Sequence, residues 1–159
     1  MPEPVSFAVG ARTTGLAGVR GVQEYLIFNL AGDAYAVELS RIREIVSPPA
    51  LTEVPRSARD IIGVCSVRGL LITVIDLRRR LSLVERPHTR FSRILLAHAA
   101  SGEIVGLFVD EVKHVVRMAG SEIELAQAVL GGDVSGYVQG IGRVQGEIVV
   151  VLDMGIVTG

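Results

Sequence analysis

The 159-residue sequence has 49% hydrophobic residues, which is enough to build the core of a globular protein. Sixteen basic and seventeen acidic residues give a formal net charge of -1, so no overall basic field attracts nucleic acid or anionic lipid. The single cysteine, Cys65, excludes an internal disulfide framework, and the aliphatic runs LLITVI and IVVVL are far shorter than the ~20 residues of a membrane helix. The first residues lack the pattern of a secretion signal, so we expect a cytoplasmic protein.

The chain begins with a segment that predicts no element. Residues 1–22 mix Gly, Ala, Thr and Arg without a period that would bury one face, and we expect a flexible tail there. The remaining residues, 23–159, contain ten short segments rich in Val, Ile, Leu and aromatic residues, separated by Gly-, Asp- or Pro-containing turns, which is typical of β-strands. These predicted strands are 24–30, 34–39, 42–46, 64–68, 70–77, 93–99, 104–109, 112–116, 138–144 and 147–153.

Few helical segments are predicted. LSRIREI (39–45) and VDEVKHV (109–115) are each expected to contain a helical turn that leads into a strand, and LRRRLSL (77–83) is expected to contain another. Four segments between strands are expected to be hairpin turns in which glycine supplies a positive φ: 31–34, 67–70, 100–103 and 144–147. Many short strands with few helices favour small barrels or a sandwich.

The chain repeats itself. GVCSVRGLLITVIDL (63–77) aligns with GIGRVQGEIVVVLDM (140–154) at an offset of 77 residues, and GDAYAVELSRIREIV (32–46) aligns with GEIVGLFVDEVKHVV (102–116) at an offset of 70. Chance similarity explains one such pair in a chain rich in Val and Gly, but two pairs in the same order are hard to attribute to it. The chain therefore divides into two related halves, about 23–92 and 93–159, which fits two small barrels packed together.

No catalytic or metal site is predicted. His88, His98 and His114 are scattered, and none has metal-ligand spacing from another histidine or from Cys65, which we expect to be a buried, unreactive thiol. No nucleophile elbow or nucleotide-binding loop is present. We expect neither enzymatic activity nor a cofactor.

Asp76 and Asp153 are equivalent in the repeat, which favours a structural role at strand ends over a catalytic one. Arg78, Arg79 and Arg80 form the only basic cluster, and we expect the solvated face of a helical turn. A nucleic-acid-binding surface would normally combine such a cluster with aromatic residues, which make up only 4% of this sequence.

Two charged residues distinguish the first half from the second. Arg68 stands where the second half has Gln145, and Glu44 stands where it has His114. Because a shared scaffold should impose shared requirements, charges present in one half only are candidates for recognition of a partner. A mutual ion pair is the structural alternative, and the two roles are compatible.

Four stretches, taken together, carry a resemblance to a known family: EYLIFNLAGDAYAVELSRIREIV, LTEVPRSARDIIGVCSVRGLLITVIDLRRRL, GEIVGLFVDEVKHVV and GYVQGIGRVQGEIVVVLDM. Over about residues 23–155 the chain resembles the CheW-like coupling proteins of bacterial chemosensory systems. The resemblance implies an all-β fold of two intertwined five-stranded SH3-like barrels and a scaffold role without catalysis. It also implies two partners, the cytoplasmic tip of a chemoreceptor and the regulatory domain of a CheA-type histidine kinase, and a place at receptor arrays without insertion into the membrane.

The resemblance also implies site residues. The receptor groove would be formed by Leu39, Ile42, Glu44, Gly63, Arg68, Ile94 and Val112, and the kinase side by Gly32, Asp33, Ser47 and Leu51. Thr73 stands where the family usually has proline, and Cys65-Ser66 replaces a more typical pair. These departures leave open an accessory adaptor that contacts only one of these partners. A separate alternative from another class is a small-barrel nucleic-acid-binding protein with Arg68 and Arg78–Arg80 as phosphate contacts.

Overall fold

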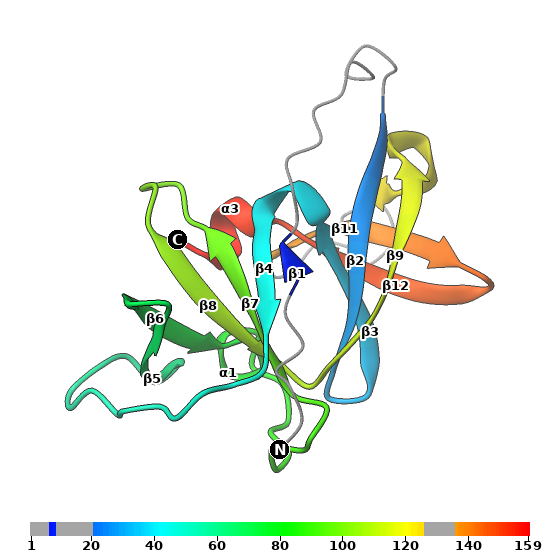
Figure 1. Ribbon diagram of the computed structural model, residues 1–159. Helices are drawn as coiled ribbons and strands as arrows, with labels where there is room; N and C mark the ends of the chain where they lie inside the picture. The colour runs from blue at the N-terminus through cyan, green and yellow to red at the C-terminus, as the bar shows by residue number, and fades with distance from the viewer. Residues whose placement is uncertain (1–6, 9–20, 126–135) are drawn as a thin grey trace.

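The computed structural model describes residues 7–8, 21–125 and 136–159, which form two β-sheets that lie side by side (Figure 1). Sheet A has the order β1-β4-β7-β8-β6-β5, with strands Phe7–Ala8 (β1), Ile42–Val46 (β4), Arg93–His98 (β7), Ile104–Val109 (β8), Leu70–Asp76 (β6) and Ile61–Val67 (β5). Sheet B has the order β10-β11-β12-β3-β2-β9, with strands Glu124–Leu125 (β10), Val138–Val144 (β11), Glu147–Leu152 (β12), Asp33–Glu38 (β3), Val22–Leu30 (β2) and Glu111–Ala119 (β9). All ten predicted strands are present.

The helical segments are single turns: Leu39–Arg41 (η2), Leu77–Arg80 (α1), Gly120–Glu122 (η3) and Met154–Val157 (α3). The helical turns predicted in 39–45 and 77–83 are confirmed as η2 and α1, but the one predicted in 109–115 is wrong. Asp110 alone connects β8 to β9, and its carboxylate accepts hydrogen bonds from the Ala31 N–H and the Arg78 guanidinium. The chain therefore turns at one residue, with no room for a helical turn.

The sequence repeat is also a structural repeat. In sheet A the parallel pair β6–β8 aligns Thr73 with Val105, and in sheet B the parallel pair β12–β3 aligns Val150 with Tyr35. These pairs are related by the offsets of 77 and 70 found in the sequence. The bulge in β4 between Ile42 and Glu44 likewise recurs in β9. The two sheets are thus copies of one scaffold.

The two sheets do not coincide with the two halves of the sequence. Strands β2 and β3 come from the first half, yet in sheet B β2 pairs with β9 and β3 pairs with β12, both of which come from the second half. The two units therefore exchange their first strands, which is the predicted intertwining. Of the predicted tail, residues 1–6 and 9–20 lie outside the described residues, and Phe7–Ala8 pairs with β4 as strand β1.

Each sheet curls so that the chain leaving one edge returns to the other. After β4, Thr52 forms a bridge with Val64 of β5, and in sheet B the segment after β9 returns as β10 to pair with β11. Glycine permits both approaches, since a Cβ on Gly63 would lie 2.7 Å from the Thr52 carbonyl oxygen and a Cβ on Gly140 would lie 2.5 Å from that of Glu124. Apart from the two-residue strands β1 and β10, each sheet has five strands, so the predicted fold of two five-stranded SH3-like barrels, here called barrel A and barrel B after their sheets, is confirmed.

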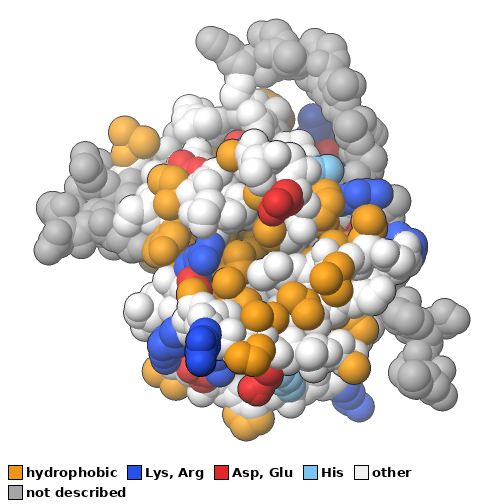
Figure 2. Space-filling view, turned by 90° about the vertical axis from the view of Figure 1, so that its left-hand side faces the viewer, with side chains coloured by type: hydrophobic (Ala, Val, Ile, Leu, Met, Phe, Trp, Pro, Cys, Tyr) orange, Lys and Arg blue, Asp and Glu red, His pale blue; other side chains and the backbone are white. Residues whose placement is uncertain are grey.

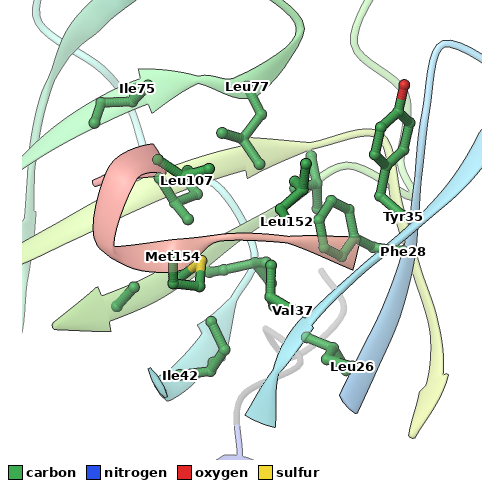
Figure 3. Close-up of a cluster of buried hydrophobic side chains, with 14 of the residues drawn as sticks. Leu26, Phe28, Tyr35, Val37, Ile42, Ile75, Leu77, Leu107, Leu152 and Met154 are labelled. Carbon is green, nitrogen blue, oxygen red and sulfur yellow. The ribbon is translucent and has the colours of Figure 1, made fainter. Parts of the chain in front are cut away.

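The central strands are buried on both faces, which explains why their sequences do not alternate cleanly. In β2, Tyr25 and Ile27 belong to the core of barrel B, whereas Leu26, Phe28 and Leu30 face a central core between the barrels. Figure 3 shows this central core, which combines Phe28 and Tyr35 of sheet B with Leu77 and Leu107 from the other barrel. The core of barrel A consists of Val46, Cys65, Ile72, Val74, Ile94, Leu96 and Phe108.

Candidate functional site

The β5–β6 hairpin carries Arg68 at its tip. Arg68 and Gly69 form a two-residue turn in which both residues have positive φ, 51° and 83°, as a type I′ turn requires. The β11–β12 hairpin has the same turn at Gln145 and Gly146, with φ of 51° and 83°. The predicted role of glycine is confirmed at both turns. Arg68 itself therefore adopts the left-handed conformation, although it is not a glycine.

Arg68 forms an ion pair with Glu44 of β4. The arginine side chain is 67% exposed, whereas the glutamate side chain is only 5% exposed, so the pair joins a buried carboxylate to a guanidinium at the surface. Glu44 lies in register with Leu96, directly beside the core of barrel A. A buried carboxylate requires a partner, and the hairpin supplies one from the opposite edge of the sheet. The pair thus fixes the hairpin tip over the end of the barrel.

Apolar residues accompany Arg68 at this hairpin. Leu70 is 49% exposed and Leu71 is 76% exposed, both immediately after the turn. Figure 2 shows the face of the molecule on this side, where apolar side chains gather among charged ones. In barrel B the residue equivalent to Leu71 is Ile148, which is 59% exposed, but Leu70 is replaced by Glu147. An exposed arginine beside exposed leucines is a typical composition for a protein interface.

The other residues assigned to the receptor groove do not form one exposed surface. Ile42 is 1% exposed and lies in the central core, against which Leu39 and Val112 pack with partial exposure. Ile94 is fully buried in the core of barrel A, in register with Val46. The structure thus places Glu44 and Arg68 together, and separately Leu39, Ile42 and Val112.

The residues assigned to the kinase side lie in two places. Gly32 and Asp33 are exposed at the β2–β3 turn, where Gly32 lies against the guanidinium of Arg86. Ser47 and Leu51 flank the segment that follows β4, and both are partly buried. Leu51 lies beside Gly63, a residue assigned to the receptor side. The two predicted sets are therefore not spatially separate.

Arg78 corrects the interpretation of the basic cluster. It is 2% exposed rather than solvated, and its guanidinium donates to both carboxylate oxygens of Asp76 at 3.0 and 2.9 Å. It also donates to Asp110 at 3.0 Å and to the Arg86 carbonyl at 2.6 Å. Asp76 fixes α1 as well, since it accepts the Arg78 N–H. The hydrogen bonds with Asp76 raise the pKa of Arg78, so its guanidinium stays charged although it is buried.

The sequence analysis missed this network, although the sequence contained a signal for it. Asp76 recurs as Asp153, but Arg78 recurs as Gly155, which is a charge difference of the same kind as that between Arg68 and Gln145. The remaining arginines of the cluster are also paired. Arg79 binds Glu85 at 3.0 Å and Arg80 binds Asp60 at 2.6 Å.

The described residues contain no group of three or more His, Cys, Asp and Glu side chains arranged to hold a metal ion. Cys65 is 4% exposed, as predicted, and burial raises the pKa of its thiol. Within the same ranges of the chain, no helix is long and apolar enough to cross a membrane.

Comparisons with known proteins show the family and the fold of this chain. Residues 24–157 match the family described as the CheW-like domain. The chemotaxis protein CheW of Bacillus subtilis (strain 168) is 30% identical over 86% of this chain and 87% of its own length. The chemotaxis protein CheW of Klebsiella aerogenes is 24% identical over 91% of this chain and 86% of its own length. The crystal structure of the scaffolding protein TtCheW from Thermoanaerobacter tengcongensis superposes with a TM-score of 0.77 at 27% identity, covering 85% of this chain and 91% of that one.

Proposed function

Since the chain belongs to the CheW-like domain family, we propose that it is a non-catalytic chemosensory adaptor that couples a methyl-accepting chemoreceptor to a CheA-type histidine kinase. Relatives named chemotaxis protein CheW, which the chain matches over more than four fifths of its length, support a role in chemotaxis. The scaffolding role named for TtCheW supports an adaptor rather than an enzyme. Such an adaptor acts in the cytoplasm, at arrays of receptors.

The observation that carries the proposal is the asymmetric pair of Arg68 and Glu44. Both barrels have the same hairpin, but in barrel B the equivalent residues are Gln145 and His114, both exposed and without an ion pair in the described part of the chain. The fold therefore does not require a charged pair at a barrel end. In barrel A the pair holds an arginine and two leucines at the surface, and an arginine anchored in this way loses little conformational freedom when a partner binds.

We assign the receptor to this end of barrel A, defined by Arg68, Leu70 and Leu71. Chemoreceptor tips are helical, and an arginine beside two exposed leucines fits a helix that presents both a carboxylate and an apolar stripe. The kinase contact is assigned to the Gly32–Asp33 turn and to the segment from Ser47 to Leu51.

The test is titration of Arg68→Ala against a receptor cytoplasmic fragment and, separately, against the kinase regulatory domain. Loss of an interface arginine should weaken receptor binding by about 1 to 3 kcal/mol, or roughly 5- to 150-fold. Gln145→Ala is the matched control, because it changes the same turn position in barrel B, and it should bind both partners like the parent.

Stability must be measured in parallel, because the pair is not fully exposed. Removing Arg68 leaves the buried Glu44 carboxylate without this partner, which should cost about 1 to 2 kcal/mol of unfolding free energy. Binding is therefore compared at temperatures where both variants are folded. Unchanged receptor affinity in folded Arg68→Ala would refute the assignment of this end of barrel A.

The two titrations also address the alternatives. An accessory adaptor would bind only one of the two fragments, whereas a coupling adaptor binds both. A nucleic-acid-binding role loses its main support, because Arg78 is buried and Arg79 and Arg80 are paired with carboxylates. Single-stranded nucleic acid at low salt completes the comparison, and we expect no binding.

A further inference from the structure

The two short helices α1 and α3 occupy equivalent places in the two barrels but differ at one position. Asp76 precedes α1 and Asp153 precedes α3, and both carboxylates accept a backbone N–H of the helix that follows. Two residues after Asp76 stands Arg78, whose guanidinium fills the space beside α1, whereas two residues after Asp153 stands Gly155. Barrel B therefore has the carboxylate without the arginine.

Barrel B has an open pocket beside Asp153, the carboxylate equivalent to Asp76. Its volume is about 300 Å³, and it is lined by Glu38, Arg41, Gln139, Leu152, Asp153 and Met154. We call it the Asp153 pocket. By the repeat, Asp153 is the counterpart of Asp76, and Glu38 is the counterpart of Phe108, the ring that the Arg78 guanidinium covers at 5.2 Å. The pocket thus corresponds to the arginine site of the other barrel.

The charges of the Asp153 pocket favour a cation. Glu38 and Asp153 contribute two negative charges and Arg41 one positive charge, and none of the three forms an ion pair with a described residue. Among the described residues, the Asp153 carboxylate accepts one hydrogen bond, on Oδ1 from the Ile156 N–H at 3.3 Å, whereas both carboxylate oxygens of Asp76 bind the guanidinium of Arg78. The outer face of the Asp153 carboxylate is therefore available to a donor.

Gly155 also has the geometry of an arginine position. A Cβ placed on it would lie 3.3 Å from Asp153 Oδ1, so a side chain there would start beside the carboxylate, as that of Arg78 does beside Asp76. The backbone of Gly155 is not in the positive-φ region that excludes other residues. Glycine at this position places no side chain beside the Asp153 carboxylate, which would have to shift by a few tenths of an ångström to admit a larger residue.

We infer that the Asp153 pocket binds a guanidinium group in trans, the side chain of an arginine presented by one of the two proteins of the proposed coupling complex. A guanidinium matches a carboxylate with two parallel N–H donors, as Arg78 matches Asp76, and an ammonium does not. Glu38, at the place of Phe108, adds a second carboxylate. The identity of the partner rests on the proposed function, but the chemistry of the pocket does not.

The first experiment uses a small probe, so that it is independent of any partner. The full chain is titrated with N-acetyl-arginine amide while the amide resonances of Glu38, Gln139, Asp153 and Met154 are followed by NMR. We expect saturable shifts with a dissociation constant on the order of 1 to 10 mM. The citrulline analogue, which has the same shape without the charge, and the lysine analogue should bind at least about fivefold more weakly.

Variants of the pocket supply the controls. Asp153→Asn and Glu38→Gln should each weaken probe binding by about tenfold, since each removes a charged acceptor. Gly155→Arg should abolish probe binding, because its own guanidinium would occupy the pocket, and it should raise the melting temperature. Gly155→Gln should leave the melting temperature nearly unchanged. Arg41→Ala should strengthen binding. Equal shifts with citrulline, or no saturable shifts in the parent, would overturn the inference.

The second experiment identifies the partner. Gly155→Arg and Gly155→Gln are titrated against the receptor fragment and the kinase regulatory domain. We expect Gly155→Arg to weaken one of the two complexes by about tenfold more than Gly155→Gln does, because it repels the partner's arginine. If the parent binds both fragments and Gly155→Arg changes neither affinity, the partner assignment is wrong even though the proposed function holds.

Discussion

Barrel A and barrel B have the same scaffold and different charges. Their strand registers, their bulges and the glycines at their closing strands correspond through the whole repeat. Their charged residues do not, since Arg68, Glu44 and Arg78 of barrel A are replaced by Gln145, His114 and Gly155. The registers, bulges and glycines that recur in both barrels are required by the fold. The charged residues that occur in one barrel only serve stability or recognition. Substitutions made at equivalent positions of both barrels therefore distinguish residues that the fold requires from residues that act in one barrel only.

The largest expected effect is at Asp76. Asp76→Ala removes two hydrogen bonds from the buried Arg78 guanidinium and should cost about 3 to 5 kcal/mol of unfolding free energy. Asp153→Ala removes only a helix-capping hydrogen bond, which is worth about 1 kcal/mol. Denaturant unfolding of both variants checks the comparison. Equal losses would mean that the arginine network contributes nothing beyond the cap.

The next effect should be similar in both barrels, with a somewhat larger loss at Gly63, because its φ of 151° also favours glycine. Gly63→Ala and Gly140→Ala each place a Cβ within 2.7 Å of a backbone carbonyl oxygen, and we expect each to cost about 1 to 3 kcal/mol. The hairpin glycines Gly69 and Gly146 have nothing within 4 Å of a Cβ, so their alanine variants should lose only about 1 kcal/mol, from their positive φ. A large loss in one barrel only would show that the closing strands are not equivalent.

A smaller effect is expected on the pH dependence of the free energy of unfolding. It arises in barrel A alone, because Cys65 is replaced in barrel B by Gly142. Burial raises the pKa of the Cys65 thiol, so the folded state holds its proton at a pH where the unfolded chain loses it. The contribution is complete below the ordinary cysteine pKa of about 8.5 and is lost as the pH rises toward the folded value. Between pH 7 and 10 the stability of the parent should fall more steeply than that of Cys65→Ala, which denaturant unfolding across this range would measure.

Tyr25 and Tyr35 also have raised pKa values, mainly because of burial, and they destabilise both proteins alike at high pH. The difference between the two stability curves therefore isolates the thiol. Parallel curves would contradict the predicted shift.

The smallest effect should follow removal of residues 1–20. Strand β1 pairs with β4 of barrel A at only two positions, Phe7 with Ile45 and Ala8 with Glu44, and we expect a loss of less than about 1 kcal/mol. Amide exchange should become faster at Glu44 and Ile45 but not at His114 and Val115 of barrel B. A fall of more than a few degrees in melting temperature would show that this segment is part of the fold.

Much of the fold was predictable because its signals are local. Strand composition, the two-residue turns at Arg68-Gly69 and Gln145-Gly146, and the repeat itself all appear within short stretches of sequence. The helical turn predicted in 109–115 was wrong because its absence depends on Asp110, whose carboxylate is held by residues from two distant elements. The pair of Glu44 and Arg68 was proposed from a comparison of the two halves, and the structure contains it.

The sequence by itself determined the strands, the repeat and the charged positions that break the repeat, because these depend on residue type and spacing. Only the tertiary structure decided which of those charges are buried. Arg68 directly follows the apolar strand β5, and Arg78 comes two residues after the apolar strand β6. The Arg68 side chain is nevertheless 67% exposed, whereas that of Arg78 is 2% exposed. The difference arises because Asp76, Asp110 and the Arg86 carbonyl converge on Arg78 from separate parts of the chain, whereas Arg68 reaches its buried carboxylate from the tip of a hairpin. Burial of a charge requires compensation from several directions at once, and no local pattern encodes that convergence.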